Sequence, residues 1–242
     1  MRPKALVGLL IPLACAALFV RLGVWQVARH RQRADYNARV SARLAADPLP
    51  FAALPGDTAL VRGQRVALEG TFRYDLEQVL AGRANEGAPS VHLLTPVERP
   101  GQDTLVVVLR GWVPSPDAAE VDRRAWRESD TVSLSGYAIP PPPDGPAAPA
   151  DTARPLRALN TAALRSRLGR PVAAAVVVMT SDEPKPGEPR PRRLPGPVLS
   201  AGNHKSYAIQ WFSFAAIAVV GGVLLFRRSA APRAIVGPRS PV

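Results

Sequence analysis

Two apolar runs, one near each end of the chain, constrain this sequence more than any other feature. The first covers residues 5–25 with Arg21 as its one charged residue, and the second covers residues 207–226 without a charge. Because a helix rises about 1.5 Å per residue, about 20 apolar residues match a hydrocarbon core about 30 Å thick. The sequence therefore predicts transmembrane helices at residues 5–25 and 204–226, the second including its interfacial start.

The first run has two alternative interpretations. Arg2 and Lys4 precede it, as in a cleaved signal peptide, and Cys15 suggests a lipoprotein anchor. The apolar run continues well past Cys15 and past any Ala-rich cleavage site, and Pro12 stands where a lipoprotein signal has an aliphatic residue. Both features favour the transmembrane helix.

Two spanning helices put both termini on one side of the membrane. A long intervening segment is translocated regardless of its charge. Charges beside the runs are divided, since Arg227 and Arg228 favour a cytoplasmic C-terminus whereas Arg29, Arg31 and Arg33 argue the other way. We give more weight to the arginines that abut the second run. We therefore expect cytoplasmic segments at residues 1–4 and 227–242 and a domain on the outer face at residues 26–203.

Alternating apolar residues between the two runs predict a strand-rich domain. We expect a helical continuation at 26–44, a short helix at 156–168, and strands at 65–72, 77–82, 90–98, 104–113, 131–139 and 172–180. Pro-rich inserts at 140–155 and 183–197 interrupt the pattern, and the second favours an extended connector. The expected fold class is an α+β membrane protein, with an antiparallel strand-rich extramembrane domain that contains one or two helices.

The charge of the chain raises the question of nucleic acid, because the formal net charge is +12. The arginines are scattered and no recognition motif accompanies them, so membrane headgroups or the carboxylates of a cofactor are better partners. A single cysteine excludes an internal disulfide and a Cys-x-x-Cys copper or redox pair. No nucleophile elbow, phosphate loop or metalloprotease motif occurs, and we expect no enzymatic activity.

The chain has three histidines. His30, among arginines, is expected to be solvated or to face headgroups, and His92 is expected to be a satisfied histidine on a strand. His204 directly precedes the second run, and helical spacing puts Tyr207 and Trp211 on its face. A neutral imidazole is an axial ligand of haem iron, and aromatic surface suits a porphyrin. The alternative is an interfacial belt that only positions the helix.

Several short motifs follow one another in a fixed order along the chain. They are Leu22-Gly23-Val24-Trp25-Gln26 with Arg29, then Gly70-Thr71-Phe72, then Arg110-Gly111-Trp112-Val113-Pro114, then Asn203-His204 with Tyr207-Ala208 and Trp211-Phe212. Taken from its residue types alone, the third motif indicates a structural corner of the sheet. As an ordered set, the motifs resemble the Surf1 (Shy1) family of cytochrome c oxidase assembly factors.

The resemblance implies two transmembrane helices, an outer domain, and non-enzymatic delivery of haem a to the catalytic subunit of a haem-copper terminal oxidase. In bacterial members a histidine at the start of the second span is implicated in holding haem a, and the matching position is His204. The expected site contains His204 as the axial ligand of the iron, with Tyr207, Trp211, Trp25 and Arg29. Arg29, Arg31 and Lys205 could meet the propionates.

The expected partners are the oxidase subunit, haem a synthase and the lipid bilayer, without nucleic acid. The expected location is a bacterial inner membrane, because no Arg- and Ser-rich presequence precedes the first run. One alternative is an assembly scaffold that binds the oxidase subunit without ligating haem. Another is a membrane-tethered hydrolase, for which the sequence has no nucleophile and base at recognisable spacing.

Overall fold

The computed structural model describes residues 3–142, 154–180 and 190–230. The chain divides into a helical unit, residues 1–38 with 199–242, and a domain, residues 39–198. Much of the predicted Pro-rich inserts at 140–155 and 183–197, most of the predicted cytoplasmic tail and the first two residues lie outside the described residues.

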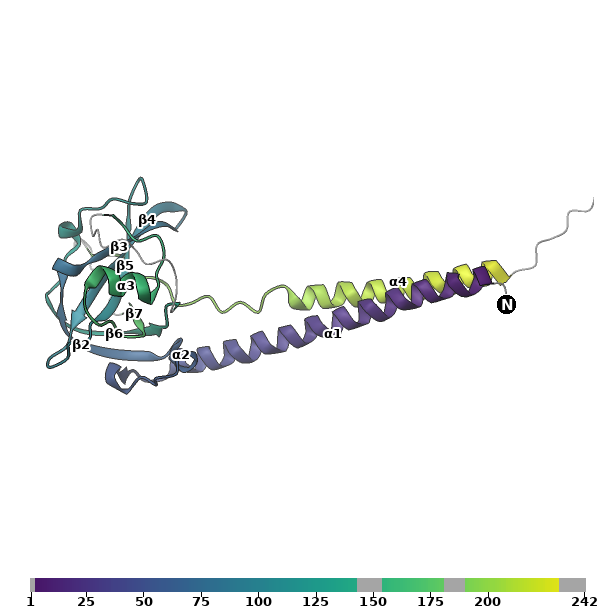
Figure 1. Cartoon of the computed structure of the whole chain (residues 1–242), viewed down its shortest axis with the longest axis horizontal. Helices are drawn as coiled ribbons and strands as arrows, with labels where there is room; N and C mark the ends of the chain where they lie inside the picture. The colour runs from purple at the N-terminus through teal and green to yellow at the C-terminus, as the bar shows by residue number, and fades with distance from the viewer. Residues whose placement is uncertain (1–2, 143–153, 181–189, 231–242) are drawn as a thin grey trace, which may run out of the picture. The chain divides into compact units, whose positions relative to one another are not determined.

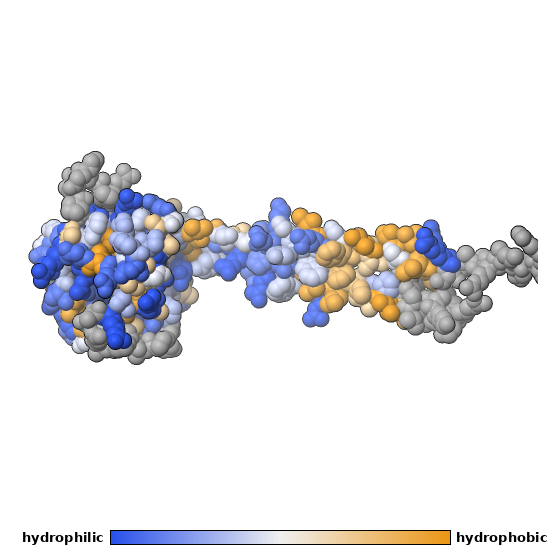
Figure 2. Space-filling model, turned by 90° about the horizontal axis from the view of Figure 1, so that it is seen from above, coloured by the Kyte–Doolittle hydropathy of each residue, from blue (hydrophilic) through white to orange (hydrophobic). Residues whose placement is uncertain are grey.

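The helical unit is built from two helices that run side by side (Figure 1). Helix α1 covers Pro3–Ala45 and helix α4 covers His204–Ala230. Both are long and apolar enough to cross a membrane, and the predicted continuation of the first helix to residue 44 is confirmed. Apolar side chains along both helices are largely exposed, and Figure 2 shows hydrophobic surface gathered over them.

Helices α1 and α4 pack through a seam that repeats every seven residues. The residues covered at this seam are Pro12, Ala16, Phe19, Gly23 and Gln26 on α1, and His204, Ala208, Trp211, Ala215, Ala218 and Gly222 on α4. Alternating steps of four and three residues are the spacing of a coiled-coil interface. A Cβ on Gly222 would lie 2.8 Å from the Cβ of Pro12. Small residues at the seam thus let two antiparallel helices approach closely.

The domain is built around one seven-stranded sheet. Its strands are β1 (Leu49–Pro50), β2 (Arg65–Phe72), β3 (Gln78–Asn85), β4 (Ala88–Glu98), β5 (Val106–Pro114), β6 (Thr131–Ile139) and β7 (Val176–Met179). Two α-helices, α2 (Thr58–Val61) and α3 (Thr161–Leu168), and 3₁₀ turns at Phe51–Ala53, Tyr74–Leu76 and Arg123–Trp126 complete the described part of the domain. Each predicted strand is present; β2 and β6 have the predicted bounds, and the other four predicted strands have shifted ends.

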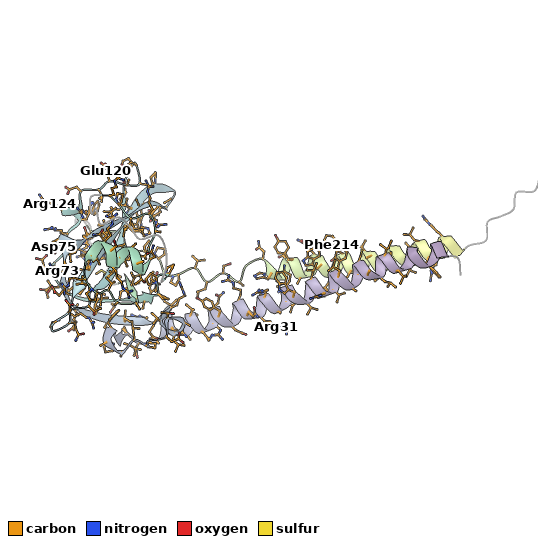
Figure 3. All side chains as sticks on the ribbon, viewed as in Figure 1. Arg31, Arg73, Asp75, Glu120, Arg124 and Phe214 are labelled. Carbon is orange, nitrogen blue, oxygen red and sulfur yellow. The ribbon has the colours of Figure 1, made fainter. Side chains whose placement is uncertain are left out.

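Five of the strands form a closed ring. The sheet order is β1-β2-β6-β7-β5-β4-β3, and an additional pairing of β2 with β4 joins the ends of the central five. Beside this closure, Arg73 forms ion pairs with Asp75 and Glu98 at 2.8 Å each. Figure 3 labels Arg73 and Asp75 on the domain. All five strands of the ring contribute to one core of buried residues, and the opposite face of β5 and β7 packs with α3 in a second core. Strands β1 and β3 lie outside the ring.

The prediction of an antiparallel sheet is wrong in part, because the sheet is mixed. Strand β7 pairs antiparallel with β6 but parallel with β5, and β1 pairs parallel with β2. Between β6 and β7 the chain makes a long excursion that includes α3, and a crossover of this length allows a parallel neighbour. Alternation along a strand predicts its faces, not its partner, so the sequence could not distinguish the two arrangements.

Arg110 lies at the centre of a buried polar cluster. Its side chain is 0% exposed, 3.8 Å from the carboxylate of Glu77 and 3.6 Å from that of Glu128, and it donates to the carbonyl of Trp126 at 2.9 Å. The hydroxyl of Thr95 donates to Glu77 at 2.5 Å. Burial raises the pKa of Glu77, although the charge of Arg110 opposes the shift. The cluster shows that the arginine of the third motif is an internal cation of the domain.

Residues 190–195, called the strap below, are held against β5. The backbone N–H of Trp112 donates to the carbonyl of Arg192 at 2.8 Å, and the N–H of Arg192 donates back at 2.9 Å. The guanidinium of Arg192 also lies 5.1 Å from the centre of the Trp112 ring. Further along, the hydroxyl of Tyr137 donates to the carbonyl of Pro195 at 3.4 Å. The predicted connector is therefore part of the domain at this point.

Gly111 makes this approach possible. Its φ is +152°, and a Cβ there would collide with the carbonyl oxygen of Arg192 and lie 3.1 Å from the Cβ of Pro191. The register of β4 against β5 shifts beside it, so Arg110 is the extra residue of a bulge. The third motif is thus a bulge in mid-strand that accepts the strap, rather than a corner of the sheet.

Candidate functional site

His204 begins helix α4 and faces α1 within the helical unit. Its Nδ1 lies 2.8 Å from Oε1 of Gln26, which is only 9% exposed. Both residues occupy seam positions of the seven-residue repeat, so the packing of the two helices brings them together. The contact fixes the orientation of the imidazole ring.

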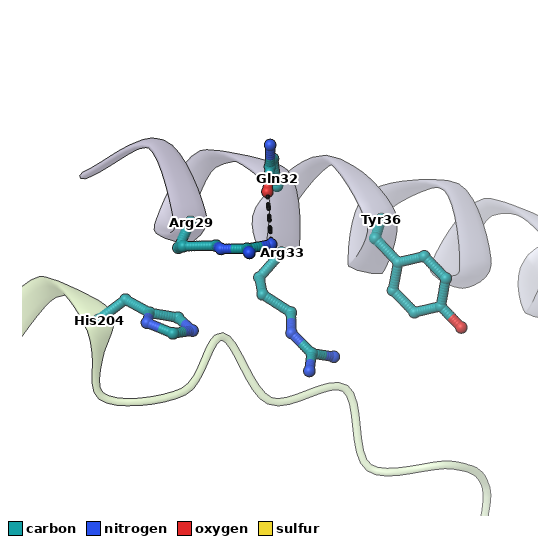
Figure 4. A pocket seen from close by; sticks show the side chains of 5 residues that line it. All are labelled: Arg29, Gln32, Arg33, Tyr36 and His204. Carbon is teal, nitrogen blue, oxygen red and sulfur yellow. Dashed lines mark hydrogen bonds between the residues drawn. The ribbon is translucent and has the colours of Figure 1, made fainter. Parts of the chain in front are cut away.

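A cavity of about 410 Å³ opens beside His204 (Figure 4). Four residues of α1 line it with the histidine, namely Arg29, Gln32, Arg33 and Tyr36. Their spacing of three, four and seven residues places them on one face of the helix. Nη1 of Arg29 donates to Oε1 of Gln32 at 3.3 Å, which holds the guanidinium at the wall.

The site is cationic, and so is the unit that contains it. Residues 1–38 and 199–242 carry eleven Lys and Arg against one acidic residue, whereas residues 39–198 carry twenty against eighteen. Most of the excess positive charge of the chain therefore belongs to the helical unit. Arg29 and Arg33 line the cavity, whereas Arg31 and Lys205, also expected to meet anions, do not. The cavity favours anionic groups close to the imidazole.

The predicted aromatic residues divide between the seam and the surface. Trp211 stacks on Phe19 with ring centroids 5.7 Å apart, so it forms part of the seam between α1 and α4. The guanidinium of Arg29 lies 5.6 Å from the centre of the Trp25 ring. Trp25 and Tyr207 are 49% and 48% exposed and do not line the cavity. The structure thus groups His204 with Arg29, and leaves Trp25 and Tyr207 on the outer surface.

His92 fulfils the prediction of a satisfied histidine on a strand. Nδ2 of Asn85 donates to its Nε2 at 3.0 Å. Burial and then the charge of Arg83 lower the pKa of His92 to about 4, so the ring is neutral near pH 7. It belongs to the framework of the domain and does not line the cavity beside His204.

Of the two expectations for His30, a solvated side chain is wrong, and a side chain that faces headgroups stays a prediction. The ring is half-buried on α1, and its Nδ1 is inaccessible and has no hydrogen-bond partner among the described residues. His30 follows Gln26 by one helical turn, so it extends the seam side of α1 rather than facing solvent.

Sequence reasoning missed four residues of the site, and one pattern could have found them. In the sequence, Gln26 belongs to a motif and Arg33 is a charge beside the first run, but neither of them is expected at the site, and Gln32 and Tyr36 belong to no motif. Their positions follow a helical period on from the apolar seam of α1. Reading that period past the end of the apolar run would have placed them beside the start of α4.

Taken together, the site offers one imidazole, two guanidinium groups and a nearby aromatic seam. A single protein ligand suits a metal that carries its other ligands with it, as haem iron does. Guanidinium groups suit carboxylates, with which they form charge-assisted hydrogen bonds. The arrangement can therefore hold a flat, metal-bearing ligand with acidic substituents.

Comparison with known proteins places most of the chain in one family. A model of the SURF1 family matches residues 13–216, which include α1 from Leu13 onward, the domain and the first half of α4. A SURF1-like protein of Monosiga brevicollis is 31% identical over 125 residues, which are 48% of this chain and 48% of that protein. The chain thus spans about half the length of this relative.

Proposed function

Because this chain belongs to the SURF1 family, we propose that it is a membrane-anchored assembly factor for a haem-copper terminal oxidase. In this proposal it holds haem a at His204 and aids its delivery to the catalytic subunit. The observation that carries the proposal is the cavity beside His204, where an imidazole and two guanidinium groups converge. The chain has no turnover of its own.

The membrane part of the proposal rests on α1 and α4. Their apolar side chains are exposed along both helices, which would be unfavourable in water and favourable in lipid. Arg227 and Arg228 follow the apolar part of α4 and favour a cytoplasmic C-terminus. We propose that both helices span a bacterial inner membrane and that the domain lies on the outer face.

The donor groups fit haem a. When bound, haem a would supply an iron that needs an axial nitrogen and two propionates that need cations. His204 would provide the nitrogen, and Arg29 and Arg33 would bind the propionates. Trp211, stacked on Phe19, offers a flat apolar surface at the adjoining seam. These side chains bind and orient the ligand, and the lipid-facing helices would accommodate its hydrophobic tail.

The partners follow from this role. The catalytic subunit of the oxidase would receive the haem, and haem a synthase is a second candidate partner as its source. A carrier must release its ligand, so we propose that the holding is transient. If His204 binds no haem, the domain would instead act as a scaffold for the oxidase subunit.

The test is the visible spectrum and the extracted haem type of the detergent-purified chain, coexpressed with the enzymes of haem a synthesis. We expect bound haem a in the wild type and its loss in His204→Ala. His30→Ala and His92→Ala are matched controls, since each removes an imidazole outside the cavity, and both should keep the haem. Haem retained by His204→Ala would contradict the ligand assignment. Absence of haem from the wild type, despite a proven supply, would favour the scaffold.

A further inference from the structure

The contact between Gln26 and His204 determines which ring nitrogen of the histidine is available. The atom that faces Nδ1 of His204 is the amide oxygen of Gln26, at 2.8 Å. An amide oxygen only accepts hydrogen bonds, so Nδ1 must carry the proton. A neutral imidazole has one N–H and one lone pair, and the lone pair then lies on Nε2.

The surroundings of Nε2 are open. Within the part of the chain that the structure describes, Nε2 has no hydrogen-bond partner. Gly202, whose φ is +67°, precedes α4 on this side. A Cβ on Gly202 would lie 3.5 Å from Nε2, an ordinary van der Waals contact, so the glycine leaves the space beside this nitrogen open. Figure 4 shows the His204 ring directed toward the cavity below Arg29.

Gln26 is itself held in place. It is nearly buried at the seam, and it is the polar member of a row of small and apolar residues on α1. A polar side chain in such a row must be satisfied, because an unpaired amide away from water costs about 1–3 kcal/mol. His204 is the partner that satisfies it. The contact therefore orders both side chains before any ligand arrives.

We propose that Gln26 is a positioning residue that fixes His204 as the Nδ1–H tautomer and reserves Nε2 for a metal. This deepens the proposed function and rests on it for the identity of the ligand, since haem iron is the metal concerned. The second partner of a metal-binding histidine commonly sets its tautomer and ring orientation. Here an amide on the neighbouring helix takes that role, so correct pairing of the two helices prepares the ligand nitrogen.

The first measurement needs no haem. The full chain, labelled with ¹⁵N-histidine in detergent at a pH where imidazole is neutral, gives the tautomer from two-bond ¹H–¹⁵N correlations, with His204→Ala to assign the signal. We expect a protonated Nδ1 and a bare Nε2. Gln26→Leu, which keeps the size but removes the acceptor, should shift His204 toward the Nε2–H form. Gln32→Leu, which alters a cavity wall without touching His204, should leave the tautomer unchanged.

Other outcomes would overturn the proposal. A protonated Nε2 in the wild type would mean that the amide of Gln26 donates through its NH₂ group instead. An unchanged tautomer in Gln26→Leu would remove Gln26 from the role. Gln26→Glu keeps an acceptor oxygen at this position and should keep the Nδ1–H form, so a shifted tautomer in this variant would also overturn it.

Haem titration separates this proposal from the proposed function. We expect Gln26→Leu to weaken haem a binding by about 10-fold, the lower end for lost supporting contacts to a ligand histidine, and Gln26→Glu to restore most of the affinity. Wild-type chain that shows the expected tautomer but binds no haem a would refute the carrier and leave the role of Gln26 intact. Weakened haem binding with an unchanged tautomer would refute the role of Gln26 and leave the carrier intact.

Discussion

Replacing Gly111 with alanine tests whether the strap is held to β5 by close backbone approach. A Cβ at this position would collide with the carbonyl oxygen of Arg192. The strap would have to withdraw, and the two backbone hydrogen bonds between Trp112 and Arg192 would be lost. At about 1 kcal/mol for each bond and about 1–2 kcal/mol for alanine at this φ, we expect a loss of about 3–4 kcal/mol.

Gly101→Ala is the matched control for this substitution. Gly101 has a φ of +70° and nothing within 4 Å of its missing Cβ, so alanine there brings backbone strain without a collision. We expect it to cost about 1 kcal/mol. The difference between the two variants isolates the approach of the strap.

Two assays on the full chain in detergent measure the effect. Denaturant unfolding gives the stability of the domain, and trypsin cleavage after Arg193 reports local release of the strap. If release of the strap becomes more favourable by about 2 kcal/mol, the fraction of molecules with a released strap rises about 30-fold. Cleavage should therefore accelerate by a similar factor in Gly111→Ala. Equal stability and equal cleavage rates in the two glycine variants would refute the reasoning.

Three further predictions concern the domain core, its one strand histidine and the helix pair. Arg110→Met should destabilise the domain by about 3–5 kcal/mol, because it leaves the Glu77 carboxylate buried without its cation, and the double variant with Glu77→Gln should recover part of that loss in denaturant unfolding. Stability should fall as pH drops below 6.5 toward 4, because unfolding lets His92 take up a proton that the folded ring, with its pKa lowered to about 4, refuses. The full pKa difference is worth at most about 3 kcal/mol, and half-burial reduces the expected effect to about 1–2 kcal/mol. Thermal melts across that pH range should show this loss of stability in the wild type and not in His92→Gln. Gly222→Leu should force α1 and α4 apart at a cost of about 1–3 kcal/mol. The separation should speed maleimide labelling of Cys15. Gly221→Leu, at a position with open space, should do neither.

Much of the fold could be predicted because apolar and polar residues alternate along β2 and along the first part of β6. Both strands have the predicted bounds, 65–72 and 131–139. Strands β5 and β7, by contrast, are buried on both faces. The last strand is shorter than the predicted 172–180, since Val172 makes only an isolated bridge to Leu105 before β7 begins. The pattern of apolar residues indicates which residues are buried, and the buried residues extend beyond those that pair with a neighbouring strand. Strand partners depend on the path of the chain, so the parallel pairs could not be predicted.

The candidate site likewise combines residues that the local sequence predicts with a contact that it does not predict. The residue type and position of His204, directly before an apolar run, indicate ligand chemistry, and the family resemblance adds Arg29. The contact between Gln26 and His204 depends on how two helices at opposite ends of the chain pair, which no local pattern reveals. A glutamine at a covered helix position is nevertheless a signal, since buried amides need partners.

Strand β7 is the last strand of the sheet in the chain, yet it lies between β5 and β6. During synthesis, β5 and β6 would therefore wait with their inner edges unpaired until residues 176–179 emerge. Such edges can pair with other chains, so the interval is a period of exposure to aggregation. Only 24 residues, 180–203, separate β7 from α4. Closure of the sheet and arrival of the second apolar helix at the membrane would thus fall within about a few seconds of each other at ordinary translation rates. If closure of the five-stranded ring were slowed, α4 would insert into the membrane while β5 and β6 still lacked β7 between them.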